Sequence, residues 1–256
     1  DLAGLHLYIT YDGDRSISID TDPGNGYPPS LLYSMRETFV SFIQEDLLHN
    51  WLVTIIRDKF FYRDEAECDQ IAELAIMLMQ EDNKKNQAFW SELKFKIHHG
   101  LVSVLERKVS FSFPSFLTFR MKGILDKLST FVEDAIDEYK MEQDYQSFIH
   151  LLRTHLLNNK PKLEKLYLKQ HHSFEFYKDD MMVMTRSEVN GFVDRKMFAD
   201  YPMYIDSHVL APLICIAPEQ LIIYCMEEAH PLISTIERIF EERVSVLPLC
   251  QLESQK

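Results

Sequence analysis

Five basic side chains gather in one short stretch of this acidic sequence. Between residues 153 and 169 they are accompanied by a single acidic residue, Glu164. Such a stretch attracts phosphate, carboxylate or nucleic acid. Nucleic-acid surfaces interleave basic and stacking side chains, however, and Tyr167 is the only aromatic residue here. This pattern predicts a charged surface face, with an anion-binding patch as the alternative; its basic members are Arg153, Lys160, Lys162, Lys165 and Lys169.

Two further cations, Arg120 and Lys122, lie just inside the start of a predicted helix. Ser115 is the expected N-cap of that helix. The partial positive charge of a helix N-terminus disfavours cations in the first turns. A carboxylate of the chain itself, a carboxylate of a partner or an anionic ligand would therefore hold them. We expect Arg120, Lys122 and Arg153 to be the ligand-binding residues, with a plain intramolecular salt bridge as the alternative.

The sequence contains no recognisable catalytic, metal or cofactor motif. H-E-x-x-H, G-x-S-x-G, the Walker pattern and G-x-G-x-x-G are all missing. Glu227 and Glu228 follow a predicted strand at the place where a phosphate loop would stand. Glu133 and Asp137 share a helix face, which predicts a solvated acidic face, with a divalent-cation site as the alternative. We therefore predict no catalytic residue, no metal and no cofactor.

Composition excludes several classes of protein. The chain has 256 residues, a formal net charge of −13 and only 7 glycines. The negative charge repels nucleic acid and anionic lipid, and scarce glycine disfavours all-β folds and glycine-loop nucleotide enzymes. The four cysteines form no C-x-x-C pair, which is typical of free thiols in a reducing compartment. Without a visible signal peptide or an apolar stretch of about 20 residues, the chain is expected to be cytoplasmic and to lack a membrane span.

The elements that must position these side chains follow from the hydrophobic pattern. Alternating apolar residues around Asp12-Gly13-Asp14 predict an N-terminal β-hairpin. From Ser30 to about residue 158, apolar residues recur at helical spacing, which predicts a multi-helix body. Its breaks are expected near Asn50, at Pro114 and between residues 139 and 142. The segment 158–161, which ends in proline, stops the last helix.

The pattern after residue 161 is different. Short apolar runs near residues 163–168 and 174–176 predict strands. Residues 221–225, 231–240 and 244–247 read as strand, helix and strand, which is a βαβ unit with parallel strands. The fold class is therefore α+β: a hairpin and multi-helix body over residues 1–158, then a smaller α/β part over residues 159–256. Whether the two parts pack as one domain or two stays open.

Four stretches together resemble the YtxC family. They are residues 59–67 (KFFYRDEAE), 116–122 (FLTFRMK), 145–153 (YQSFIHLLR) and 213–224 (LICIAPEQLIIY). Most of these stretches are apolar structural runs, and Phe119-Arg120-Met121-Lys122 is the most distinctive piece. The family is assigned to sporulation in endospore-forming Bacillus-like bacteria, so the resemblance implies a cytoplasmic protein of sporulating cells. It supplies no catalytic residue.

These observations favour a non-enzymatic interaction or regulatory protein with an unidentified protein partner. Self-association into a homo-oligomer is left open. One alternative is an enzyme or anion-binding protein with a site between the helical body and the βαβ unit. Another is nucleic-acid binding through residues 153–169, which the net charge disfavours.

Overall fold

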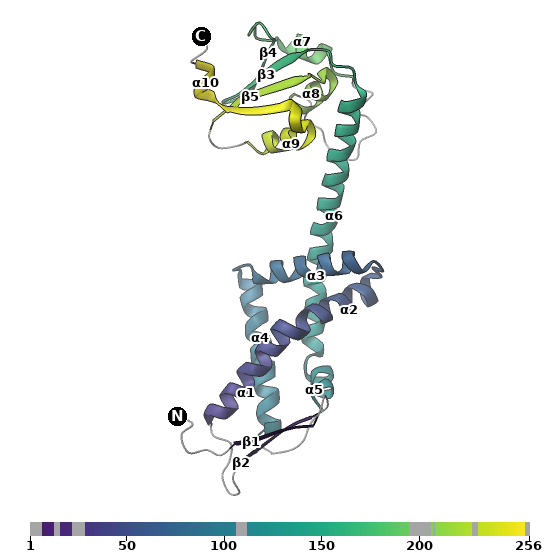
Figure 1. Cartoon of the computed structure of the whole chain (residues 1–256). Helices are drawn as coiled ribbons and strands as arrows, with labels where there is room; N and C mark the ends of the chain where they lie inside the picture. The colour runs from purple at the N-terminus through teal and green to yellow at the C-terminus, as the bar shows by residue number, and fades with distance from the viewer. Residues whose placement is uncertain are drawn as a thin grey trace. The chain divides into compact units, whose positions relative to one another are not determined.

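The structure is a computed structural model that describes residues 7–12, 16–21, 29–105, 112–194, 206, 208–226 and 230–253. It divides into two compact units, Asp1–Lys140 (unit 1) and Met141–Lys256 (unit 2). In the described part, unit 1 is mainly helical and unit 2 combines a four-stranded sheet with helices (Figure 1). The predicted α+β class is therefore confirmed.

Unit 1 begins with two short strands, β1 (Leu7–Asp12) and β2 (Ser16–Thr21), which pair antiparallel. The predicted Asp-Gly turn between them, residues 13–15, lies outside the described residues. The N-terminal hairpin therefore stays a prediction.

The helical part of unit 1 follows the predicted 3.6-residue pattern. Its elements are α1 (Pro29–Phe42), the π-helical turn η1 (Ile43–Leu47), α2 (Leu48–Phe60), α3 (Glu65–Gln80), α4 (Lys84–Leu105), α5 (Phe113–Arg120) and the first part of α6 (Lys122–Asn158). The break expected near Asn50 is instead the change of helical pitch at η1. Asp64 caps α3, because its carboxylate accepts the Glu67 N–H at 3.0 Å.

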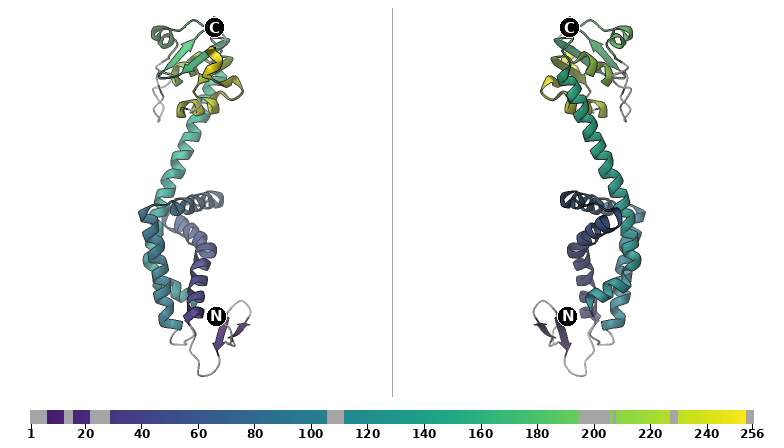
Figure 2. Two further views of the ribbon diagram at one scale, coloured as in Figure 1. Left: turned by 90° about the vertical axis from the view of Figure 1, so that its left-hand side faces the viewer. Right: turned by 90° about the vertical axis from the view of Figure 1, so that its right-hand side faces the viewer.

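Helix α4 runs antiparallel to the first part of α6 (Figures 1 and 2). Lys85 pairs with Asp134 at 2.6 Å, and Glu92 pairs with Lys127 further along. A core shared by α2, α3, α4 and α6 fills unit 1. Its most deeply buried members include Leu52, Ile56, Ile71, Ala75, Leu93, Ile97, Leu128 and Val132.

The helix break falls at Met121, not between residues 139 and 142. Helix α6 is continuous over 37 residues, so the predicted division of this segment is wrong. Residues 137–144 are mostly polar and interrupt the apolar stripe, but they include no proline or glycine that would end a helix. Ser112, rather than Ser115, caps α5.

Unit 2 is built on a sheet of strand order β4-β3-β5-β6. β3 pairs antiparallel with β4 and parallel with β5, and β5 pairs parallel with β6. The predicted βαβ unit is therefore present. The elements are β3 (Lys165–Gln170), β4 (Phe174–Tyr177), α7 (Arg186–Gly191), α8 (Leu210–Ile216), β5 (Gln220–Cys225), α9 (Pro231–Phe240), the 3-10 turn η2 (Glu241–Arg243), β6 (Val244–Pro248) and α10 (Leu249–Glu253).

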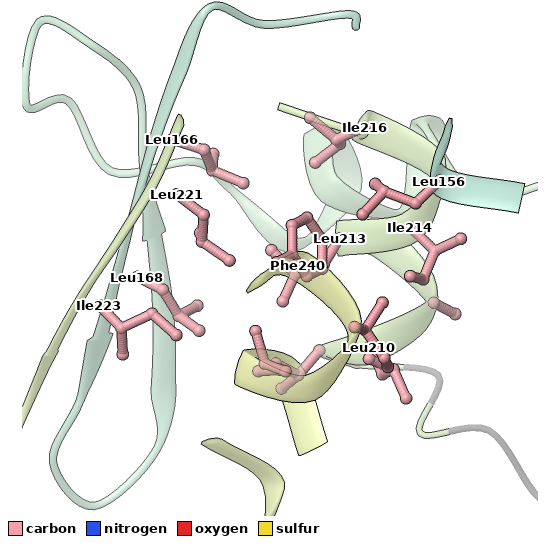
Figure 3. Close-up of a cluster of buried hydrophobic side chains, with 14 of the residues drawn as sticks. Leu156, Leu166, Leu168, Leu210, Leu213, Ile214, Ile216, Leu221, Ile223 and Phe240 are labelled. Carbon is pink, nitrogen blue, oxygen red and sulfur yellow. The ribbon is translucent and has the colours of Figure 1, made fainter. Parts of the chain in front are cut away.

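One face of this sheet packs against helices. Figure 3 shows leucine and isoleucine side chains of β3 and β5 directed toward side chains of α8 and toward Phe240 of α9, with Leu156 of α6 nearby. These side chains alternate with more exposed ones along β3 and the first part of β5, whereas Tyr224 and Cys225 at the end of β5 are both buried. The most deeply buried strand members of this core are Leu166, Leu168, Leu221 and Ile223, each at most 1% exposed.

The opposite face carries mixed side chains. Tyr167 of β3 stacks on Tyr224 of β5, with ring centres 6.4 Å apart. Lys165 and Lys169 lie on the same face because side chains alternate along β3. Within the described ranges, no helix is long and apolar enough to cross a bilayer.

Candidate functional site

The predicted cations Arg120 and Lys122 flank the junction of α5 and α6. Met121 between them has φ −99° and ψ 0°, and its N–H binds the Leu117 carbonyl. Its side chain is fully buried, whereas Arg120 and Lys122 are exposed. The buried methionine holds the α5–α6 junction, which we call the corner, against the core of unit 1. Arg120 and Lys122 are exposed on either side of it.

Helix α4 approaches this corner closely. A Cβ on Gly100 would lie 2.8 Å from the Phe116 ring of α5 and 3.8 Å from Cγ of Arg120. A Cβ on Gly123 would lie 3.0 Å from the Lys96 ammonium. Gly100 and Gly123 therefore give α5 and α6 room against α4. Lys96 joins the corner as a third cation.

The charges at this corner are only partly compensated. Glu92 binds Lys96 at 3.0 Å and also pairs with Lys127. These two ammonium groups, Lys127 foremost, hold the pKa of the Glu92 carboxyl below its ordinary value. Among the residues that the structure describes, Arg120 and Lys122 form no ion pair or side-chain hydrogen bond. The intramolecular salt bridge considered for them is thus not formed within the described residues.

Phe119 adds an apolar contact point to the same corner. Its side chain is 82% exposed, the highest value among the large apolar side chains described. An exposed aromatic ring next to two cations is typical of protein interfaces, which are enriched in aromatic residues and arginine. We call Phe119, Arg120 and Lys122 the corner patch.

Arg153, the third predicted ligand-binding residue, lies in unit 2. Its guanidinium pairs with the Glu241 carboxylate at the end of α9. Arg153 is therefore engaged within its own unit, and the structure does not show it sharing a site with the corner patch.

The predicted basic segment is dispersed over unit 2. Lys160 is exposed. Lys162 donates to the Phe192 carbonyl at 3.5 Å, and its ammonium lies 5.7 Å from the centre of the Phe192 ring. Lys169 lies 4.0 Å from Glu175. Lys162 and Lys169, two of the four predicted lysines, thus lie near groups of the chain that reduce their attraction for an anionic ligand.

Lys165 lines a shallow cavity of about 380 Å³. The other lining residues are Leu163, Glu164, Lys178, Asp179 and Asp180. Lys178 is occupied by Glu188 at 2.7 Å, and Asp180 accepts the Met182 N–H at 3.0 Å. The mixed charges give this cavity no clear preference for anions or cations.

The acidic helix face behaves as a solvated surface. Glu133 is half exposed and pairs with Lys59 at 3.1 Å. No group of three or more His, Cys, Asp or Glu side chains in the described ranges could hold a metal ion. Glu227 and Glu228 lie outside the described residues.

Sequence reasoning missed Phe119 and Lys96 as members of the corner. Apolar residues at helical spacing are expected to be buried, and the break at Met121, which leaves Phe119 exposed, was not foreseen. Gly100 and Gly123 were the available signal: single glycines within helices often mark a close approach of another element.

Comparison with known proteins gives two findings. The family model described as "YtxC-like family" matches residues 33–245. The protein named "Uncharacterized protein YtxC" of Bacillus subtilis (strain 168) is 33% identical over 243 residues, covering 94% of this chain and 85% of that protein. No solved structure matches the chain.

Proposed function

Because the chain belongs to the YtxC-like family, we propose that it is a non-enzymatic interaction protein of the cytoplasm of sporulating cells, and that a protein partner with an acidic segment docks on the corner patch. The role in sporulation comes from the resemblance set out above. The non-enzymatic role is supported by the lack of catalytic motifs in the sequence.

The exposed Phe119 beside Arg120 and Lys122, which form no ion pair with any described residue, is the observation that carries the proposal. Binding energy at interfaces concentrates in a few aromatic and arginine side chains that become fully desolvated. A large apolar ring left 82% exposed gains most from such a contact.

Charge complementarity points to an acidic partner. The whole chain carries a net charge of −13, yet the corner presents, close to Lys96, two cations that no described carboxylate pairs with. Carboxylates of a partner would satisfy the Arg120 guanidinium through charge-assisted hydrogen bonds. They would also be steered to this corner and away from the acidic remainder of the surface.

The test compares two charge-reversed chains. Arg120→Glu/Lys122→Glu reverses the corner patch. Lys84→Glu/Lys94→Glu makes the same change of charge at two exposed lysines of α4, which have no ion pair among the described residues. Tagged forms of both variants and of the native chain are used for affinity capture from extracts of sporulating cells. The binding of each captured protein is then measured with purified components.

We expect a specific partner whose affinity falls at least tenfold, about 1.4 kcal/mol, with the corner reversal and stays within about twofold with the α4 reversal. Equal losses with both variants would show a general effect of charge. The proposal fails if the corner reversal leaves every captured partner bound as tightly as before.

A further inference from the structure

Phe61 combines a strained backbone conformation with a large apolar side chain that unit 1 leaves exposed. It ends α2 with a positive φ of 61° and ψ of 22°, the left-handed conformation usually taken by glycine. Its side chain is also 70% exposed. A bulky residue with positive φ is uncommon, and strain of this kind is often held at functional sites.

The aromatic residues on either side of Phe61 behave differently. Phe60 and Tyr62 pack against the core of unit 1. Phe61 alone points outward, and among the described residues it has no ring or cation contact. Phe60 and Tyr62 therefore supply the packing contacts of this turn, and the exposed Phe61 ring is not needed for them.

The turn that presents Phe61 is firmly tied. The N–H groups of Phe61 and Tyr62 both bind the Ile56 carbonyl. Asp64 caps α3, and Arg57 pairs with Glu65 across the turn at 3.3 Å. The ring is therefore held in a defined place, and little conformational entropy would be lost when it becomes buried.

Among the described residues, three other non-glycine residues have positive φ: Met181, Ala217 and Glu241. Met181 lies in a tight turn in which its N–H binds the Lys178 carbonyl at 2.9 Å, and its side chain is 36% exposed. Ala217 is fully buried with a short side chain, and Glu241 pairs with Arg153. Phe61 is the bulkiest and most exposed apolar side chain of this group.

We propose that Phe61 is an anchor residue that inserts into an apolar pocket of the protein partner, with Arg63 pairing to a carboxylate at the pocket's rim. Arg63 lies two residues along the same turn, is exposed and forms no ion pair within the described part of the chain. A guanidinium beside an aromatic anchor suits a pocket that is apolar inside and acidic at its edge. This second contact point rests on the proposed interaction function.

The first measurement separates strain from binding in the purified full chain. Phe61→Gly removes both the strain and the ring, and we expect it to raise the thermal unfolding midpoint by about 2–4 °C. Phe61→Ala removes the ring but keeps a Cβ at positive φ, and we expect no such gain. If Phe61→Gly lowers the midpoint, the ring contributes to folding and the inference is overturned.

The second measurement locates the partner. The photo-crosslinking residue p-benzoylphenylalanine replaces Phe61 in sporulating cells, and in a control strain it replaces Tyr33, another exposed aromatic residue of unit 1 at 62% exposure. We expect a discrete crosslinked protein from position 61 that position 33 does not give, and that is lost when Arg63 is changed to Glu.

The outcomes distinguish this inference from the proposed function. No crosslink from position 61, or the same bands from both positions, overturns the anchor role. A crosslink to a second copy of the chain also overturns it, in favour of self-association. If the corner reversal still weakens a partner while position 61 gives nothing, the proposed function stands and only the anchor falls.

Discussion

Arg153 of α6 pairs with Glu241, the residue that closes α9 with a positive φ of 46°. The guanidinium thus holds the side chain of a residue whose backbone is strained. This pairing gives Arg153 a structural role within unit 2. Arg153, which the sequence suggested as a ligand-binding residue, therefore forms an ion pair within unit 2.

We predict that Arg153→Met lowers the free energy of unfolding by about 0.2–1 kcal/mol, because the pair is partly exposed and the methionine keeps much of the apolar stem. Glu241→Gly loses the pair but relieves the strained φ, so it should be nearly neutral. Denaturant unfolding of both variants measures the difference. A larger loss for Glu241→Gly than for Arg153→Met would contradict this account.

Glu188 makes the stability of unit 2 depend on acid. Lys178 donates to its carboxylate at 2.7 Å, and the N–H and hydroxyl of Thr185 at the start of α7 also donate. These bonds lower the pKa of Glu188 from 4.5 to about 2. A lowered carboxyl pKa stabilises the fold above the ordinary value, and this contribution is lost as the pH falls toward 2.

We therefore predict that Glu188→Gln lowers the thermal midpoint at neutral pH, and that its difference from the native chain shrinks as the pH falls from above 4.5 toward 2. Thermal scans over a pH series measure this difference. Thr185→Ala should lose part of the same pH dependence, because the Thr185 hydroxyl caps α7 and also donates to the Glu188 carboxylate. A Glu188→Gln difference that does not change with pH would refute the assignment.

Gly100 is expected to tolerate no larger residue. An added methyl group would meet the Phe116 ring at 2.8 Å, and Phe116 belongs to the core of unit 1. Overpacking costs about 1–3 kcal/mol, against which alanine gains up to about 1 kcal/mol of helix propensity. We predict a net loss of stability for Gly100→Ala in chemical unfolding.

Gly191 supplies the matched control for that substitution. It lies at the end of α7, and a Cβ there would have no atom within 4 Å. Gly191→Ala should leave stability unchanged or slightly raised. Equal losses at the two positions would show that the close approach of α4 to α5 is not what requires glycine.

The lysines of residues 160–169 are predicted not to form a nucleic-acid surface. The net charge of −13 repels phosphate, and Lys162 and Lys169 have intramolecular neighbours. Fluorescence anisotropy with a labelled single-stranded oligonucleotide should show no binding at low salt. Binding that weakens steeply with added salt, and that Lys160→Glu/Lys165→Glu abolishes, would establish the opposite.

Local signals in the sequence predicted much of the fold. The βαβ unit was predicted from Pro231 in the first turn of α9 and from the apolar runs on either side of that helix. Such signals are local, because helix starts and buried strands each have a characteristic residue pattern. Asp64 was likewise recognisable as an N-cap. The continuity of α6 was missed because its polar middle carries no apolar periodicity, and solvated helical turns leave no such trace.

The candidate site could be predicted only in part. Arg120 and Lys122 were singled out as cations near a helix start. This placement is wrong for Arg120, which lies in the last turn of α5, where the helix dipole favours a cation; only Lys122 lies at a helix start, that of α6. The exposure of Phe119 depends on the break at Met121, and the nearness of Lys96 depends on how closely α4 approaches Gly123. Such distances between elements are set by tertiary packing, which a single sequence does not reveal.

The place of β5 between β3 and β6 has a consequence for the order of folding. Lys165 is opposite Gln220 in the register, so the parallel pairing of β3 must wait until the ribosome has delivered residues 220–225. Until then, the β3–β4 pair holds Leu166 and Leu168 without the strand that covers one side of them. Closing long loops is slow, and unpaired strand edges invite aggregation. Nascent unit 2 therefore exposes an unpaired edge of β3 until residues 220–225 have been synthesised.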